Sequence, residues 1–402
     1  MRVFCALLVL VGLRDQQDWH TGNASRSWTR YVLLLLASYA LSTVAVRGLG
    51  AAALNTAVVE DAKIALYFAL SAGLIAACSS ERIRHAIVLA VILTGFAVIA
   101  LSVMTFVSFA NLNFTYDDIR AAKFVLSEHY GIVLNSTVHL GFLGLILFWV
   151  MDVGRFAKVA ATIFVLGFAA ITTTRTPIGA LFVSFAVLAG VYFFRKTTVR
   201  QRLAAALVII GLPIVYLFSL DTSGLVRLGV SIDNALAGRA ELWLVASQSF
   251  LNDPIFGSGP GSWSMIVPRF ALRIAPLFTG KLDEALSLTT GGYHNTFVTA
   301  LAERGIVGLS VLLLAFAFIL KSSFRLKASP AAFRGDFDKR VVAVLPLLWI
   351  YMSVRGLFEE SGLFGRANSD VDFVSLVLLA LTLAYANNLD AVHDPRPGAE
   401  YR

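Results

Sequence analysis

The sequence predicts an all-α fold: a polytopic integral membrane helix bundle of about 11–12 transmembrane helices, with one large outer loop that contains an amphipathic helix. Composition is the first reason. Of 402 residues, 58% are hydrophobic and only 14% are charged, whereas a soluble domain carries about 25% charged residues. The apolar residues also come in blocks too uniform for helices with one wet face. One long stretch, residues 220–295, separates the last three blocks from the others.

Eleven hydrophobic segments fit the rule that a helix needs about 20 apolar residues to cross a bilayer, and somewhat fewer when its ends are wet. They lie near residues 1–13, 31–46, 62–78, 85–108, 131–151, 156–173, 178–194, 203–219, 296–320, 341–355 and 370–387. The first is too short to cross and lacks the basic leader of a signal peptide. We therefore expect an intact relative to carry an additional hydrophobic stretch upstream, which mapping the translation start would test.

Basic residues predict which loops face the cytoplasm, because short cytoplasmic loops collect Lys and Arg. The two strongest clusters follow residues 194 and 320, and alternation places three further basic loops on the same side. The residues are Arg14, Arg26, Arg30, Arg82, Arg84, Arg155, Lys158, Arg195, Lys196, Arg200, Arg202, Lys321, Arg325, Lys327, Arg334, Lys339 and Arg340. Stretches 47–61, 109–130, 174–177, 220–295 and 356–369 are then expected outside.

Three parts of the chain follow from this topology. Residues 1–219 form an N-terminal bundle of about eight segments, residues 220–295 form the large outer loop, and residues 296–402 form three C-terminal segments and a short cytoplasmic tail. A loop as long as 220–295 is usually functional or disordered. Its composition argues against disorder, so we expect any chemistry to involve it.

Several classes of site are not predicted. The net charge of +8 falls in short runs between apolar blocks, so no nucleic-acid partner is expected. Cys5 and Cys78 lie in hydrophobic stretches away from any His or Asp cluster, which argues against a disulfide framework or a thiolate metal site. The sequence also has no metal-ligand spacing and no phosphate-binding loop. We therefore expect no metal and no cofactor.

The large loop contains a predicted helix over residues 233–251, DNALAGRAELWLVASQSFL. Asp233 or Asn234 can cap its start, and a proline closes it. One face, defined by i, i+4, i+7 and i+11 spacing, suits a helix that lies on the membrane. That face consists of Arg239, Trp243, Ala246 and Phe250.

The stretch FGSGPGSW follows this helix and places glycines where a tight turn needs them. No strand precedes it and Pro260 interrupts it. A dinucleotide-binding fingerprint is therefore not predicted.

The loop ends in GGYHNTFVTALAERGIVGL, where His294 lies just before a helix that Asn295 can cap. A helix N-terminus favours an anion such as phosphate or pyrophosphate, and a histidine there can exchange protons near neutral pH. The alternative is an interfacial histidine that only finishes a turn.

Glu303 lies about 12 Å further along that helix, where ionisable groups usually face a partner or a cavity. We expect structural pairing for Glu303 and Arg304.

Two other outer stretches carry charged candidates. Arg175, in TTTRTPIGAL, is an outward arginine that the positive-inside rule disfavours. It is either a snorkelling anchor or a fixed cation for a substrate phosphate. The last outer loop, RGLFEESGLFGR, has charged residues that either pair with one another or supply a catalytic carboxylate. These are Arg355, Glu359, Glu360 and Arg366.

Three of these stretches together resemble the O-antigen ligase and polymerase superfamily of bacterial membrane glycosyltransferases, which includes exopolysaccharide polymerases. They are TTTRTPIGAL, GRAELWLVASQSFLNDPIFGSGPGSW and HNTFVTALAERGIVGL, and their order around the large loop matches as well. The resemblance implies about a dozen helices with a large periplasmic loop before the last three, so this chain looks one helix short at its N-terminus. It departs from the pattern at TRTP, where many members have a serine before the arginine and a small residue after it.

The resemblance implies a glycosyltransferase of the bacterial cell inner membrane that needs no metal. It would transfer a glycan from undecaprenyl pyrophosphate to a sugar hydroxyl or to lipid A core. Guanidinium groups would stabilise the departing pyrophosphate, and a histidine would take the acceptor proton. The residues carried over are Arg175 and Arg239 for the pyrophosphate and His294 for the acceptor, with Asn295, Glu303 and Trp243 as supporting residues.

Alternatives remain open within and beyond this class. Polymerisation of O-antigen or exopolysaccharide repeat units, ligation to lipid A core and protein-directed transfer are not separated by the sequence. A chain-length regulator and a flippase are possible assembly partners. A transporter or flippase is the main alternative class; it should show internal repeats and helices broken at the midplane.

Overall fold

The computed structural model describes residues 23–45, 51–109, 125–126, 134–172, 175–194, 239–263, 266, 293–357, 359 and 370–393. Within these ranges every regular element is a helix, so the predicted all-α class is confirmed. The hydrophobic segments 1–13 and 203–219, and most of the large loop, lie outside the described residues.

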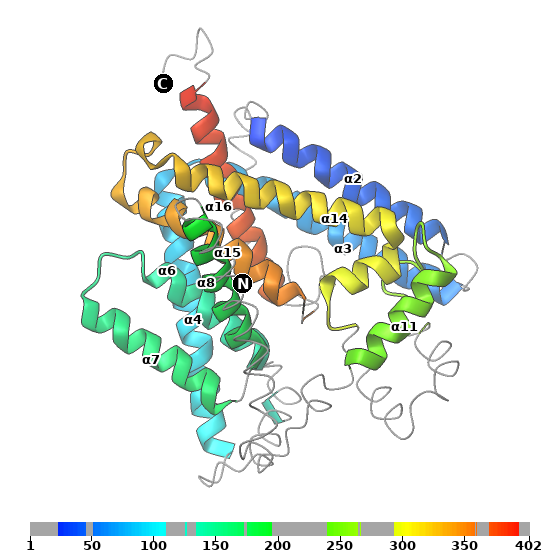
Figure 1. The fold of residues 1–402 in the computed structure, drawn as a ribbon, viewed down its shortest axis with the longest axis horizontal. Helices are drawn as coiled ribbons and strands as arrows, with labels where there is room; N and C mark the ends of the chain where they lie inside the picture. Colours follow the sequence, from blue (N-terminus) through cyan, green and yellow to red (C-terminus); the bar gives the residue numbers. More distant parts are fainter. Residues whose placement is uncertain are drawn as a thin grey trace.

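Ten α-helices and one 3₁₀ turn make up the described fold (Figure 1). They are α2 (Asn23–Ala45), α3 (Ala51–Ala77), α4 (Glu81–Phe109), α6 (Leu134–Phe148), α7 (Arg155–Ile171), α8 (Arg175–Phe194), α11 (Arg239–Asn252), α14 (Thr296–Ala328), η6 (Pro330–Ala332), α15 (Asp336–Gly356) and α16 (Asp370–His393).

Several helices extend beyond the hydrophobic segments that predicted them. α14 continues to Ala328 and α15 begins at Asp336, where segments 296–320 and 341–355 were expected. The difference arises because hydropathy falls at the first charged residues, whereas Lys, Arg and Ser can still continue a helix. The extra turn of α15 also places Asp336 and Asp338 at the positive end of the helix dipole.

Three described helices are long and apolar enough to cross a membrane, over Glu81–Thr105, Thr296–Ala328 and Val374–Val392. Two shorter apolar helices span Leu134–Phe148 and Thr176–Gly190. Large apolar side chains also remain exposed on the outside of the bundle, as on α7, where Phe156 is 87% exposed. This is an all-α helical membrane protein.

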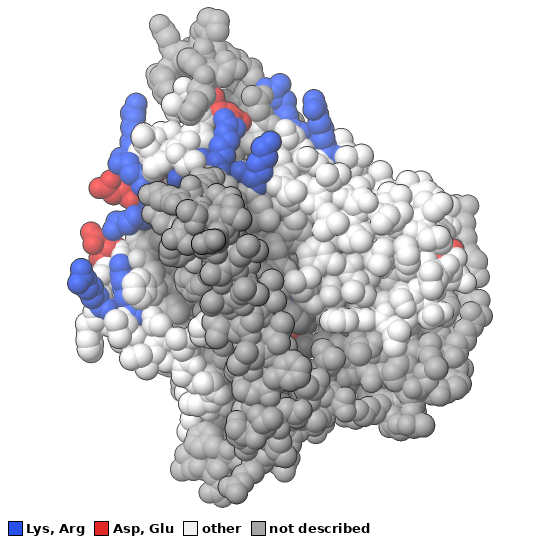
Figure 2. Space-filling view, viewed as in Figure 1, with Lys and Arg blue, Asp and Glu red and all other residues white. Residues whose placement is uncertain are grey.

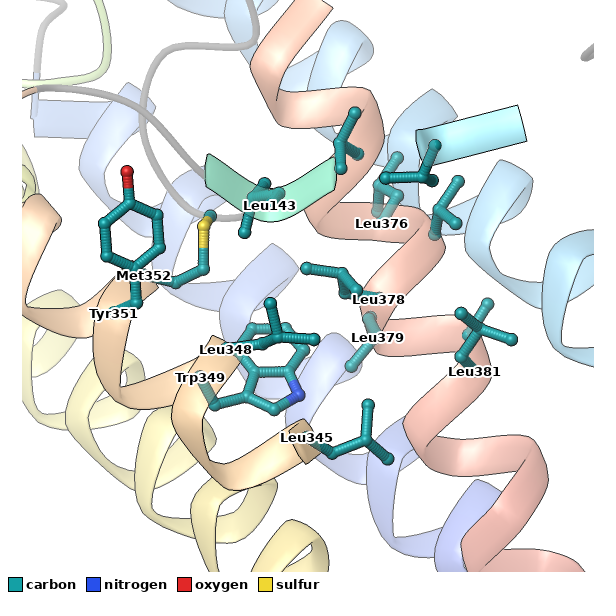
Figure 3. Close-up of a cluster of buried hydrophobic side chains, with 14 of the residues drawn as sticks. Leu143, Leu345, Leu348, Trp349, Tyr351, Met352, Leu376, Leu378, Leu379 and Leu381 are labelled. Carbon is teal, nitrogen blue, oxygen red and sulfur yellow. The ribbon is translucent and has the colours of Figure 1, made fainter. Parts of the chain in front are cut away.

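The centre of the bundle lies where α15 and α16 meet α6. Figure 3 shows leucines from these helices packed around Trp349, whose indole N–H donates to the Thr382 hydroxyl at 2.9 Å. Tyr351 directs its hydroxyl away from the labelled leucines. Around this centre, α8 packs along α15, α4 packs on α6, and α2 and α3 lie beside α14 and α16 (Figure 1).

Three of the loops predicted to be cytoplasmic meet at one end of the bundle. The Arg84 guanidinium donates to Asp338 Oδ2 at 2.9 Å, and the Tyr385 hydroxyl donates to Asp338 Oδ1 at 2.6 Å. Arg340 approaches Asp152 at 4.0 Å. Figure 2 shows the Lys and Arg side chains of the visible face gathered in this region. These three basic loops therefore share one end, as alternation requires.

Helix α14 is broken at Gly305, which has φ 64° and ψ −165°. In a continuous helix the N–H groups of Ile306 and Val307 would donate to the carbonyls of Ala302 and Glu303. The break separates these four groups, and each needs a new partner, since backbone N–H and C=O groups away from water are almost always hydrogen-bonded.

The glycine-rich stretch after α11 supplies all four partners from its own backbone. Ser258 N–H and Gly259 N–H donate to the Ala302 and Glu303 carbonyls at 3.0 and 2.8 Å. Ile306 N–H and Val307 N–H donate to the Pro254 and Ile255 carbonyls at 2.9 and 3.3 Å. Residues 254–259, called the docked turn below, thus complete the broken helix. The expected tight turn is confirmed, and its partner is α14.

Glycine is required on both sides of this contact because the backbones approach so closely. A Cβ added to Gly257, which has φ 69°, would lie 2.4 Å from the Arg304 nitrogen. A Cβ added to Gly305 would lie 2.3 Å from the Ile255 carbonyl oxygen. No side chain larger than hydrogen fits between the docked turn and the break.

Candidate active site

His294 stands at the exit of the large loop, one residue before the cap of α14. Its φ of 51° is in the left-handed region, which few residues other than glycine adopt. Its Nδ1 lies 3.9 Å from Glu359 Oε2, and 29% of its side chain is exposed. The imidazole is therefore held beside a carboxylate, and part of it remains exposed at the protein surface.

Asn295 fixes the backbone that carries this histidine. Its Oδ1 accepts hydrogen bonds from the N–H groups of Phe297 and Val298 at 2.9 and 3.0 Å, which confirms the expected cap. Its Nδ2 donates to the Leu357 carbonyl at 2.8 Å. One side chain thus caps α14 and ties its start to the end of α15.

Glu359 reaches the site from the segment that follows α15. The Thr296 hydroxyl donates to its backbone carbonyl at 3.0 Å, and Asn135 Nδ2 of α6 donates to its Oε1 at 3.2 Å. Its other carboxylate oxygen faces His294. Glu359 was expected either to pair within its own loop or to serve as a carboxylate. The structure places it against α6 and α14.

Trp243 connects α11 to the same region. Its indole N–H donates at 3.1 Å to the carbonyl of Tyr293, the residue before His294. Tyr293 is fully buried and packs edge-on against Trp263, with ring centroids 4.1 Å apart. Trp243 therefore fixes the backbone on the N-terminal side of His294, as Asn295 does on the other side.

Helix α11 packs on α14 through a face next to the one predicted to lie on the membrane. Its buried side chains are Leu242, Val245, Ala246 and Ser249. Of the predicted face, Ala246 is buried, whereas Trp243 and Phe250 are half-buried. The packing of α11 on the first piece of α14 was not indicated by the loop sequence alone. That the predicted face lies on the membrane stays a prediction.

Glu303 and Arg304 belong to the helix break and lie two turns from His294. Both are buried, at 4% and 2% exposure. The Glu303 carbonyl accepts from Gly259 N–H and from the Ser42 hydroxyl of α2. The Arg304 guanidinium lies over the Tyr39 ring, 4.5 Å from its centroid. The structural pairing expected for the two charged side chains stays a prediction.

Arg239 and Arg175 are the first residues of α11 and α8. Their side chains lie outside the described part of the structure. Arg239 precedes Trp243 by one helical turn, and α8 packs along α15, the helix that leads to Glu359. Both arginines thus begin helices that pack against the elements of the site.

Residues 160–313 of the chain match the family model described as O-antigen ligase. This match supports a relationship to the O-antigen ligase and polymerase superfamily. No curated protein matches the sequence. The family match runs from α7 to the middle of α14 and includes the docked turn and the helix break.

The O-antigen ligase match confirms the resemblance seen in the sequence. It supports a ligase or polymerase type of function in surface polysaccharide assembly, with lipid-linked glycan and acceptor substrates in the membrane. All three motif stretches fall inside 160–313. Asn135 and Glu359 fall outside it, so the O-antigen ligase region does not by itself contain every residue beside His294.

Sequence reasoning missed the partners of His294 because they come from distant segments. Glu359 was noted as a charged residue of the last outer loop, and Asn135 was not noted at all. The available signal was polarity: Asn135 interrupts the apolar segment 131–151, and polar groups inside membrane segments usually face protein.

Proposed function

We propose that the protein is a glycosyltransferase of surface polysaccharide assembly that transfers a glycan from undecaprenyl pyrophosphate to an acceptor sugar hydroxyl. It would act at the periplasmic face of the bacterial inner membrane, as a multi-pass protein divided into residues 1–219, 220–295 and 296–402. The observation that carries the proposal is His294, held between two fixed backbone segments and beside the Glu359 carboxylate.

The proposed reaction begins with removal of the acceptor proton. If the Nδ1–H group of His294 donates a hydrogen bond to the Glu359 carboxylate, the Nε2 lone pair is left to act as base. As Nε2 takes the hydroxyl proton, the acceptor oxygen bonds to the anomeric carbon, and the bond from that carbon to the pyrophosphate oxygen breaks. The products are the extended glycan and undecaprenyl pyrophosphate, and the imidazolium returns its proton to water.

The leaving group gains negative charge during this step, and fixed cations would stabilise it. Arg239 and Arg175 are assigned this role from the family motifs. Planar guanidinium groups bind phosphate oxygens in pairs, and pre-placed charges are effective where water is excluded. In this scheme no divalent ion is required.

The broken helix α14 bears on the alternative that the protein is a transporter. Transporters use unwound helices to expose backbone groups to substrates and ions. Here the four groups freed at Gly305 are paired with the docked turn. The break therefore serves to join the loop to the bundle, which favours the transferase.

Two substitutions test the proposed site. His294→Ala and Arg239→Ala should each lower transfer by about 100-fold or more. Arg325→Ala is the matched control, because Arg325 lies at the other end of the bundle with its side chain 53% exposed. Activity is measured on purified protein with donor extracted from a strain that lacks the gene. Wild-type transfer by either site variant would refute the assignment.

The surface glycan of a strain that lacks the gene separates the possible acceptors. Loss of chain length with retained attachment indicates a polymerase, and loss of attachment with normal chain length indicates a ligase. We propose polymerisation of a surface or exopolysaccharide. Purified protein that carries lipid-linked glycan across vesicles and joins nothing would instead establish the transporter.

A further inference from the structure

Helix α6 presents two polar side chains to the end of α15 that leads to the site. Asn135 and His139 are four residues apart and so share one face of α6. On α15 and its extension, Tyr351, Arg355 and Glu359 are spaced by the same four residues, and Glu359 N–H donates to the Arg355 carbonyl at 3.0 Å as in a helix. Two polar rows therefore face each other.

The deeper contact between these rows is sealed from solvent. His139 Nδ1 lies 2.9 Å from the Tyr351 hydroxyl, and the rings stack with centroids 5.1 Å apart. Both residues have 0% exposure. This buried hydrogen bond sets the register of α6 against α15, because a slip of either helix would leave two polar groups unpaired.

The shallower contact reaches the carboxylate of Glu359. Asn135 Nδ2 donates to Oε1 at 3.2 Å, while Oε2 is the oxygen nearest His294 at 3.9 Å. The backbone of this segment is separately fixed by Asn295 and Thr296. The Asn135 amide thus contacts the carboxylate itself and not only the backbone that carries it.

We propose that Asn135 is a positioning residue that orients Glu359 so that Oε2 faces His294. The proposal rests on the proposed roles of His294 and Glu359. The terminal torsion of a glutamate is broad and has no strong preferred rotamer, so hydrogen bonds to its oxygens decide how the carboxylate is oriented. A hydrogen bond from an amide to one oxygen removes that freedom and is strengthened by the negative charge.

A purely structural role for Asn135, tying α6 to α15, is the competing explanation. The His139–Tyr351 contact already holds these helices together one turn deeper. Asn135 itself is only half-buried, and its partner is the carboxylate that faces His294. The two explanations predict different kcat values when Asn135→Ala is combined with a substitution that removes the Glu359 charge.

The test is a double-mutant cycle on the full-length protein in detergent. The variants are Asn135→Ala, Glu359→Gln and both together, with glycan-charged undecaprenyl pyrophosphate from a deletion strain as donor. Asn135→Ala should lower kcat by about 10- to 100-fold with little change in donor KM. Asn135→Gln, which keeps the amide, should restore part of the loss. Ser136→Ala, about 100° round the helix, is the matched control.

The two explanations give opposite results in the double variant. If Asn135 acts through Glu359, the double variant has the kcat of Glu359→Gln alone, because effects through one group do not add. If the two losses multiply, or if Asn135→Ala lowers the melting temperature and leaves kcat unchanged, the positioning role is wrong. If His294→Ala and Glu359→Gln are both fully active, it is the proposed function that fails.

Discussion

Gly305→Ala perturbs the contact that joins the large loop to the bundle. The added Cβ would lie 2.3 Å from the Ile255 carbonyl oxygen and 2.4 Å from its carbon, both of them backbone atoms that cannot move without displacing the docked turn. The backbone at this position, φ 64° and ψ −165°, is also a conformation that only glycine adopts readily.

The magnitude follows from two separate costs. A residue with a side chain forced into such a backbone conformation costs about 1–3 kcal/mol, and overpacking of a filled interior costs about 1–3 kcal/mol. Together they lower the free energy of unfolding by about 2–6 kcal/mol. That is a large part of the stability of a typical protein, which is about 5–15 kcal/mol.

The matched control is Gly167→Ala in the interior of α7, where nothing lies within 4 Å of the added Cβ. It should stabilise the helix by about 0.5–1 kcal/mol. Thermal unfolding of both variants in detergent, together with glycan transfer, gives the comparison. Gly305→Ala should melt lower and lose transfer, because the docked turn carries α11 and with it Trp243. Equal melting temperatures and full activity in both variants would refute the reasoning.

Three further changes test separate contacts. Trp243→Phe removes one hydrogen bond to the backbone before His294; it should cost about 1 kcal/mol of stability and lower kcat, as measured by melting and turnover. Asp338→Ala leaves Arg84 buried without its carboxylate and should destabilise by about 3–5 kcal/mol, whereas Asp336→Ala, 85% exposed, should change the melting temperature little. Arg175→Lys keeps the charge but loses the planar fork, so the donor KM should rise if phosphate binding is bidentate.

Much of the fold could be predicted because it depends on local patterns. Apolar blocks predicted the membrane helices, although α2, α3 and α14 run about eight to eleven residues beyond the predicted segments. Basic loops predicted a topology in which Arg84, Asp338 and Arg340 share one end. The Asn295 cap was also predictable, since capping needs only an adjacent side chain. In each case the cause and the effect lie within a few residues of each other.

The helix break was not predictable, because both of its halves look helical. The stretch TFVTALAERGIVGL has good helix formers on both sides of Gly305, and a single glycine costs a helix only about 1 kcal/mol. What stabilises the break is the docked turn, forty to fifty residues earlier in the chain, which pairs with the four freed backbone groups. Glu359 was missed as a partner of His294 for the same reason, since its contacts come from α6 and α14.

The break also explains how His294 meets a carboxylate that follows α15. If α14 ran straight, the ten residues from Gly305 back to Asn295 would carry the cap about 15 Å along the helix axis, away from the end of α15. Because the chain changes direction at Gly305 (Figure 1), the cap instead meets Leu357 and the histidine meets Glu359. The docked turn that stabilises the break comes directly after α11, the helix that carries Trp243 and begins with Arg239. One backbone contact therefore sets the position of both the proposed base, His294, and the helix that begins with Arg239, which is why a methyl group at Gly305 should abolish transfer without contacting His294 or Arg239.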